Sequence, residues 1–252
     1  MKFEVKGTIL PVLEATLDAG ETVVSTHGDL GWMTPNVEMS QTTKMANGGG
    51  FMKSLKRVVG GGGLFVTRYT AQGAPGVVVF TTKLPGEIIS LDLSSGREYM
   101  VHSSGFLCGT EGITASVAMQ QKLTSGLFGG AGFFLQHLSG QGTAWLELGG
   151  EMFAYDLQPG QTLRVHPGHV AAFETSVNFQ MTTVPGIANK FLSGNGLLLA
   201  NLTGPGKVWL QSMSVATLAH AIEPYLPTES NRTTAGGLGG GIVGGIVSGA
   251  LQ

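Results

Sequence analysis

The sequence predicts an all-β protein made of three tandem small β-barrel or sandwich units, followed by a short C-terminal helix and a glycine-rich tail. Three observations carry this prediction. Glycine accounts for 41 of 252 residues and charged residues for only 12%, which favours tightly turning β-structure over helix bundles. Short apolar runs are separated by turn residues roughly every ten positions. Several landmarks also recur at one period, as tandem homologous units require.

The element that repeats most clearly is a predicted β-hairpin at residues 132–146. Its first half alternates side chains between two faces, and Gly140 and Gly142 supply the positive φ that a tight turn needs. The residues after the turn form a β-branched and aromatic return strand. The same pattern occurs at 196–210 and, with a longer loop, at 63–79.

Three kinds of landmark hold the same register. The glycines that open the hairpins are separated by 69 and 64 residues, the glycines of an upstream turn by 76 and 64, and three histidines by 75 and 64. They are Gly63, Gly132 and Gly196; Gly20, Gly96 and Gly160; and His27, His102 and His166. Because all three kinds share one period, we expect three homologous units.

We expect the chain to divide at the ends of these repeats. The expected segments are residues 1–82, a β-unit with a glycine-rich insertion; 83–147 and 148–212, two further β-units; 213–228, a helical segment; and 229–252, the glycine-rich tail. The helix is predicted because four apolar residues recur at helical spacing, after a possible N-cap at Ser214 and before Pro224. They are Val215, Leu218, Ala219 and Ile222.

Composition narrows the classes of partner. Lys and Arg total 14 against 16 Asp and Glu, and the formal net charge is −2, which does not favour nucleic acid as a partner. The single Cys108 excludes an intrachain disulfide. The first residues alternate as a strand does and lack the apolar core of a signal peptide. We therefore expect a cytoplasmic protein, with membrane association as the alternative.

The histidines are the first candidates for chemistry. Three histidines in register suggest zinc binding, but a repeat fold distributes equivalent residues over separate sites. We therefore expect each ring to hydrogen-bond backbone or water near a strand end. His166 and His169 flank Pro167, which excludes a helix between them, and Glu174 is a weak candidate for a third ligand. The sequence predicts no metal site.

Candidate nucleophiles and phosphate loops are weaker. Cys108 lies in an apolar strand, where cysteine usually acts as a small hydrophobic residue, and no G-x-S-x-G motif is present. The segment Gly204-Pro205-Gly206-Lys207 lacks the spacing and the hydroxyl residue of a phosphate-binding loop. We predict no catalytic residues, no cofactor-binding residues, no cofactor and no enzymatic activity.

A short basic segment lies inside the insertion of the first unit. Lys53, Lys56 and Arg57 could contact a membrane or an acidic partner, with apolar residues on the opposite helical face. The equivalent segments of the later repeats each keep a single lysine, Lys122 and Lys190. This pattern favours an ordinary linker helix that packs on its own β-unit.

Several motifs together resemble the AIM24 family, a group of uncharacterised bacterial and mitochondrial proteins. They are Gly20-Glu21-Thr22-Val23, Gly31-Trp32-Met33, Gly129-Gly130-Ala131-Gly132-Phe133-Phe134, Gly168-His169-Val170 and Pro205-Gly206-Lys207-Val208-Trp209-Leu210. The resemblance implies three units of the small, double-stranded β-helix-like fold also seen in the tryptophan RNA-binding attenuation protein. It further implies a homotrimer in which the units of three chains close a ring. The motifs are turn glycines and core apolar residues, which identify a fold and no reaction.

Two functions are open at this point. The first is a non-enzymatic, ring-forming scaffold or binding protein, indicated by the repeats, the low charge and the lack of a complete catalytic motif. The alternative is a small-ligand-binding protein, or an enzyme, with its site in a cleft between units or subunits, where pockets usually form.

The tail adds a possible contact surface. Residues 233–252 carry no charged side chain, and two rows of small residues recur at every fourth position, a pattern that lets apolar helices pack closely in membranes. They are Gly241, Gly245 and Gly249, and Gly236, Gly240, Gly244 and Ser248. Each helical glycine costs about 1 kcal/mol relative to alanine. The alternatives are a mobile tail, self-association with neighbouring tails, and contact with a protein or a membrane.

Overall fold

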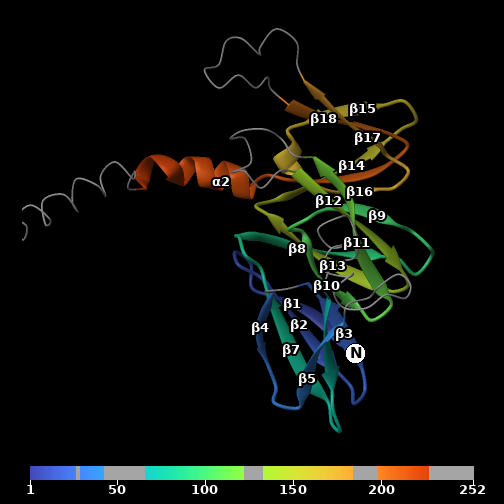
Figure 1. The fold of residues 1–252 in the computed structure, drawn as a ribbon, viewed down its shortest axis with the longest axis vertical. Helices are drawn as coiled ribbons and strands as arrows, with labels where there is room; N and C mark the ends of the chain where they lie inside the picture. Colours follow the sequence, from blue (N-terminus) through green and yellow to red (C-terminus); the bar gives the residue numbers. More distant parts are fainter. Residues whose placement is uncertain (27–28, 43–65, 122–132, 184–197, 227–252) are drawn as a thin grey trace, which may run out of the picture. The chain divides into compact units, whose positions relative to one another are not determined.

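The computed structural model describes residues 1–26, 29–42, 66–121, 133–183 and 198–226 (Figure 1). The chain divides into two compact units, Met1–Ala216 and Thr217–Gln252. The first unit contains all of the described strands, which confirms the all-β prediction. The predicted helix is also confirmed, as α2 (Val215–Ile222), and a 3-10 turn, η2 (Glu223–Tyr225), follows it. No helix in the described ranges has the length and apolar character needed to span a bilayer.

After the N-terminal strand β1 (Lys2–Lys6), the strands fall into three successive sets of six. The first set is β2 (Val12–Leu17), β3 (Thr22–Ser25), β4 (Leu30–Met33), β5 (Val37–Thr42), β6 (Val66–Ala71) and β7 (Gly76–Thr81). The second set is β8 (Gly86–Asp92), β9 (Tyr99–His102), β10 (Phe106–Thr110), β11 (Ile113–Gln121), β12 (Phe133–Gly140) and β13 (Thr143–Gly149). The third set is β14 (Met152–Leu157), β15 (Thr162–Val165), β16 (Val170–Glu174), β17 (Asn178–Thr183), β18 (Leu198–Thr203) and β19 (Gly206–Gln211), with the 3-10 turn η1 (Pro167–His169) before β16.

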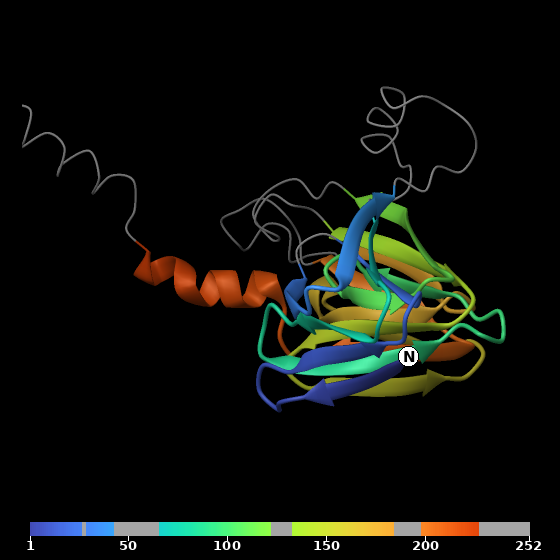
Figure 2. The same cartoon turned by 90° about the horizontal axis from the view of Figure 1, so that it is seen from below.

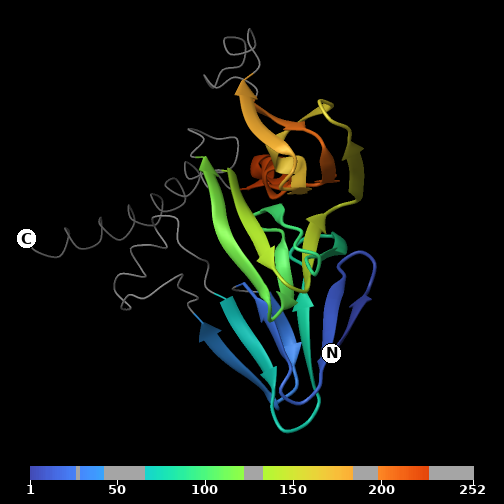
Figure 3. The same cartoon turned by 90° about the vertical axis from the view of Figure 1, so that its right-hand side faces the viewer.

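Each set contributes to two sheets in the same way. Its first, sixth and third strands are neighbours in one sheet, and its fourth, fifth and second strands are neighbours in another. The second strand of one set then pairs antiparallel with the third strand of the next set, as β3 with β10 and β9 with β16. Figure 2 shows the strands of the first unit stacked in layers, and Figure 3 shows the sets following one another.

The predicted hairpins are wrong in one respect. The chain does turn sharply between β12 and β13, but these strands lie in different sheets and do not pair with each other. The same holds for β18 with β19 and for β6 with β7. Each predicted hairpin is therefore an arch that crosses from one sheet to the facing sheet.

The hydrogen bonds at the arch explain the difference. In a hairpin the turn would bond across its own two strands. Here Gln141 N–H donates to the carbonyl of Gly112 (3.2 Å), and Leu93 N–H donates to the carbonyl of Gly142 (2.8 Å). The turn residues are therefore satisfied by neighbouring turns, which leaves β12 and β13 free to pair in separate sheets.

The predicted turn glycines upstream of each second strand are confirmed. Gly20, Gly96 and Gly160 have φ values of 86°, 76° and 79°, in the left-handed region that favours glycine. The boundaries expected at residues 82, 147 and 212 stay predictions, because the strands lie in one compact unit.

The core consists of three clusters of buried apolar residues, and each of them contains side chains from two sets. The cluster of the first set is completed by residues of the second: Leu107, Cys108 and Trp145. The cluster of the second set is completed in the same way by Ala171 and Ala172 of the third. Consecutive sets therefore share a continuous apolar interior as well as a sheet.

Candidate functional site

One strand in the first set and one in the third set remain at the edge of a sheet, although their equivalents elsewhere join consecutive sets. β4 is the third strand of the first set and β15 is the second strand of the third set, and both are edge strands. Their equivalents within the chain are paired with a neighbouring set. Unpaired edge strands present free N–H and C=O groups to another chain.

The side chains on β4 reflect this difference. Trp32, Cys108 and Ala172 each follow a bulge at the same place in the third strand of their sets. Cys108 and Ala172 are fully buried between consecutive sets, whereas Trp32 is 57% exposed. At the two internal junctions this position is covered by the preceding set, and on β4 no preceding set covers it.

β15 shows the complementary exposure. All four residues of its equivalent in the first set, β3, are buried, whereas Thr162 and Arg164 of β15 are exposed. Thr162 also keeps a hydroxyl contact with Thr203 (2.8 Å), as Thr22 does with Thr70 (2.9 Å). The third set therefore has the same internal contact as the first set, but no following set pairs with β15.

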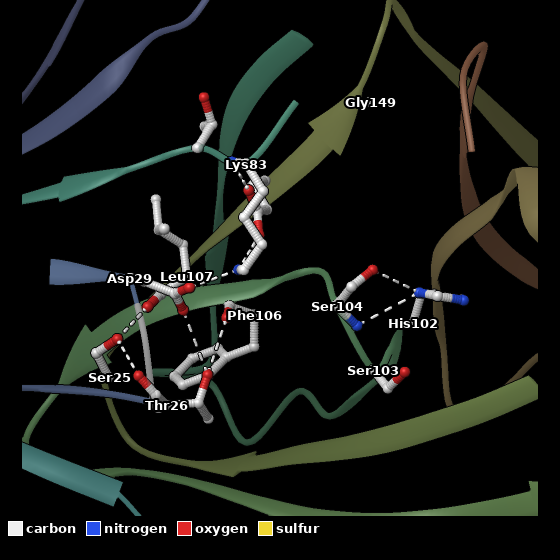
Figure 4. A network of polar contacts seen from close by, with 12 residues as sticks. Ser25, Thr26, Asp29, Lys83, His102, Ser103, Ser104, Phe106, Leu107 and Gly149 are labelled. Atoms are coloured by element: carbon white, nitrogen blue, oxygen red, sulfur yellow. Dashed lines mark hydrogen bonds and ion pairs between the residues drawn. The ribbon is translucent and has the colours of Figure 1, made fainter. Parts of the chain in front are cut away.

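A polar cluster of one half-exposed amine and two largely buried carboxyl groups lies where the first two sets meet (Figure 4). Asp29 precedes β4, Lys83 lies between β7 and β8, and Glu147 is on β13. Lys83 Nζ is 2.5 Å from Asp29 Oδ1 and 2.5 Å from Glu147 Oε1. The side chain of Asp29 is 1% exposed, that of Glu147 9% and that of Lys83 49%.

Burial and pairing act in opposite directions on these charges. Burial raises the pKa of Asp29, and the hydrogen bond and charge of Lys83 offset only part of this rise. Burial lowers the pKa of Lys83, but its contacts with Asp29 and Glu147 outweigh burial and leave that pKa raised. The cluster therefore holds an ammonium group beside a carboxyl group that resists ionisation.

Side chains at the ends of strands connect consecutive sets. Glu147 Oε2 accepts the backbone N–H of Lys83 (2.8 Å), and Gln211 Oε1 accepts that of Gly149 (3.0 Å). Ser25 Oγ donates to the carbonyl of Leu107 (2.6 Å) across the first junction. The pairings of whole strands are thus supplemented by side-chain hydrogen bonds.

The described histidines occupy separate places. His102 Nδ1 contacts Ser104 Oγ (2.9 Å) two residues away, and burial lowers the pKa of His102 to about 4. The rings of His166 and His169 are 5.8 Å apart, and His169 Nδ1 contacts the carbonyl of Gln211 (2.8 Å). Burial, and secondarily the neighbouring His169, lowers the pKa of His166.

Glu174, the candidate for a third ligand beside His166 and His169, has a different partner. Glu174 Oε2 instead accepts the N–H of Lys207 (2.9 Å). Within the described ranges, no three or more His, Cys, Asp or Glu side chains are grouped as a metal site requires. Cys108 is buried, as expected, and burial raises the pKa of its thiol well above its usual range, which is the opposite of nucleophile activation.

Several predictions fall outside the described residues. They concern His27, the basic segment with Lys53, Lys56 and Arg57, the linkers with Lys122 and Lys190, and the tail from residue 233 to residue 252. In the segment Gly204-Pro205-Gly206-Lys207, the first two residues connect β18 to β19 and the last two begin β19.

The cluster of Asp29, Lys83 and Glu147 was not predicted from the sequence. Its members are far apart in the chain and belong to no motif. One sequence pattern does indicate part of it. A polar residue follows the dipeptide Trp-Leu in two of the repeats, and these polar residues are Glu147 and Gln211. Both residues take the same role at consecutive junctions.

A family model and one named relative indicate the same family. The family model described as "Mitochondrial biogenesis AIM24" matches residues 3–213. An uncharacterised protein of Streptococcus pyogenes serotype M6 is 26% identical over 237 residues, which cover 92% of this chain and 93% of the relative. The mitochondrial "Altered inheritance of mitochondria protein 24" of Verticillium alfalfae is 26% identical over 178 residues, which cover 70% of this chain and 44% of that protein.

A solved structure shares the fold. The crystal structure of a Streptococcus pyogenes protein superposes with a TM-score of 0.71 at 22% sequence identity, and the match covers 89% of this chain and 99% of that one. At this identity the likeness concerns the fold alone.

Proposed function

Because the chain belongs to the AIM24 family, we propose that it is a non-enzymatic scaffold or binding protein that assembles into a closed ring. The observation that carries the proposal is the pair of edge strands β4 and β15, which are equivalent to strands that join consecutive sets inside the chain. Pairing β15 of one copy with β4 of another would repeat the internal junction. The ring is a homotrimer, as the family resemblance implies.

Head-to-tail pairing of this kind is heterologous, and it ends without free edges only if the ring closes. It would cover the exposed Trp32 on β4 and the exposed residues of β15. Full burial of a large apolar side chain contributes about 1.5–3 kcal/mol, and the paired backbone groups add to this. A closed ring would contain one junction between β15 and β4 for each copy of the chain. A single substitution at the junction would therefore act at every one of them.

The oligomeric state tests this proposal. Light scattering after size exclusion should give a trimer for the wild type and smaller species for Trp32→Glu, because the charge cannot be buried at the junction. The matched control is Phe153→Glu, which changes another exposed aromatic, on β14, an edge that no internal junction uses. A monomeric wild type at micromolar concentration, or a Trp32→Glu variant that is still trimeric, would contradict the proposal.

The proposal includes the tail as a tether to a protein or a membrane. Three tails on one ring would act together, so weak individual contacts gain through avidity. Deletion of residues 233–252 should leave the trimer intact. It should also reduce the amount of protein that sediments with phospholipid vesicles or with partner proteins from a cell extract. Equal distribution of the intact and deleted proteins would remove the tail from the proposal while leaving the ring untouched.

A further inference from the structure

Lys83, Asp29 and Glu147 form a cluster whose chemistry the scaffold function does not use. The Lys83 amine lies between two carboxyl groups at contact distance, and Figure 4 shows its end directed at Asp29. We propose that Lys83 and Asp29 become joined by an amide bond between Nζ and the Asp29 carboxyl carbon, with Glu147 as the proton acceptor.

Main-chain hydrogen bonds hold the reacting groups in place. The carbonyl of Asp29 accepts the N–H of Thr81 (2.9 Å), at the end of β7. The N–H of Lys83 donates to Glu147 Oε2 (2.8 Å), so the same glutamate that faces the amine also positions its backbone. Groups fixed at contact distance react as if at a very high local concentration.

The surroundings make the uncharged form of Asp29 easier to reach than it is in water. Its side chain is 1% exposed, and Phe106 and Leu107 beside it are buried. Burial raises the pKa of Asp29, and the protonated carboxyl group is the form that an amine can attack. Asp29 Oδ1 is also buried, and Lys83 Nζ approaches it to 2.5 Å.

Glu147 supplies the base that the amine needs. The contacts of Lys83 keep its pKa raised, so the amine is reactive only while its proton resides on a neighbour. Glu147 Oε1 is 2.5 Å from Nζ and its side chain is 9% exposed, which puts a nearly buried carboxylate within proton-transfer distance. Thr26 Oγ1 donates to Asp29 Oδ2 at 3.4 Å.

The reaction balances without a cofactor. The Lys83 ammonium transfers one proton to Glu147, and the freed electron pair of Nζ forms a bond to the carboxyl carbon of protonated Asp29. The tetrahedral intermediate expels its hydroxyl group as water, which takes up the proton held by Glu147, while the nitrogen loses its remaining extra proton to solvent. One C–N bond forms, one C–O bond breaks, and nothing is oxidised or reduced. The product replaces a poorly solvated carboxyl group with a neutral amide, which burial tolerates better.

Intact-mass spectrometry of the denatured full-length chain tests the proposal. The wild type should be lighter than its sequence by one water molecule, and a digest should contain a branched peptide that joins Asp29 to Lys83. Lys83→Arg, Asp29→Ala and Glu147→Gln should keep the full mass. Asp29→Asn provides a positive variant, because an amide formed from asparagine releases ammonia in place of water.

The exposed ion pair of Lys6 and Glu14 is the matched control. Its Nζ to Oε1 distance is 2.7 Å, but its amine is paired with one carboxyl group where that of Lys83 is paired with two, so it should stay unlinked in the digest. Circular dichroism and size exclusion establish that each variant is folded. A folded wild type with its full mass, or a loss of water that persists in Lys83→Arg, would overturn the inference and would leave the proposed ring unaffected.

Discussion

Gly142 offers a quantitative test of the arch between β12 and β13. Its φ is 127°, and a Cβ atom added there would lie 1.9 Å from Thr110 Oγ1. That oxygen accepts the N–H of Thr143 at 3.2 Å, at the start of β13. Gly142→Ala therefore combines an unfavourable backbone conformation with the displacement of a hydrogen-bonded side chain.

The two effects can be added from general magnitudes. A non-glycine residue in a sparsely populated backbone region costs about 1–3 kcal/mol. Loss of the Thr110 bond leaves the N–H of Thr143 unsatisfied, at about 1–3 kcal/mol. We expect Gly142→Ala to lower the free energy of unfolding by about 2–6 kcal/mol, nearer the lower limit because Thr143 is only partly buried.

Gly96→Ala is the matched control. Gly96 has a φ of 76°, but an added Cβ meets nothing within 4 Å, so only the left-handed backbone cost of about 1–2 kcal/mol applies. Urea denaturation at one protein concentration measures both variants. If Gly142→Ala were no more destabilising than Gly96→Ala, the close approach at the arch would be refuted.

Three further predictions follow from burial. Leu107→Ala, at the junction of the first two sets, should lower the free energy of unfolding by about 2–5 kcal/mol. Val5→Ala, on the exposed side of β1, should change it by no more than about 0.5 kcal/mol in the same urea assay. Equal effects of the two substitutions would contradict a core shared between sets. Because the pKa of His102 is about 4 when folded and 6.5 when unperturbed, the unfolded chain binds more protons between these values, so stability is full above the higher pKa and falls as the pH drops toward the lower one. An NMR titration of the His102 ring with a midpoint near the unperturbed value would refute this. The buried Cys108 thiol should react with Ellman's reagent only on unfolding, and rapid reaction of the native protein would show that the strand is open.

The sequence by itself determined the class of fold and much of its local structure. Glycines at 20, 96 and 160 had to lie in turns, and they do so with positive φ, because few other residues adopt that conformation. The helical spacing from Val215 to Ile222 specified α2, and the apolar neighbours of Cys108 specified its burial. The turns and the helix depend on residues close in the chain, whereas the contacts that bury Cys108 come from the neighbouring set, although its apolar neighbours in the sequence were enough to predict the burial.

Tertiary structure decided which strands pair. Residues 133–138 carry apolar side chains on both faces, as a strand inside a layered fold requires, and this pattern fits a hairpin and an arch equally well. The arch forms because its turn makes hydrogen bonds with residues distant in the sequence, from Gln141 N–H to the carbonyl of Gly112 and from Leu93 N–H to the carbonyl of Gly142. The cluster of Asp29, Lys83 and Glu147 has the same cause, because these residues are distant in the sequence and meet where β3 of the first set pairs with β10 of the second. Local sequence encodes conformation, whereas the meeting of distant side chains is set by which strands pair with each other.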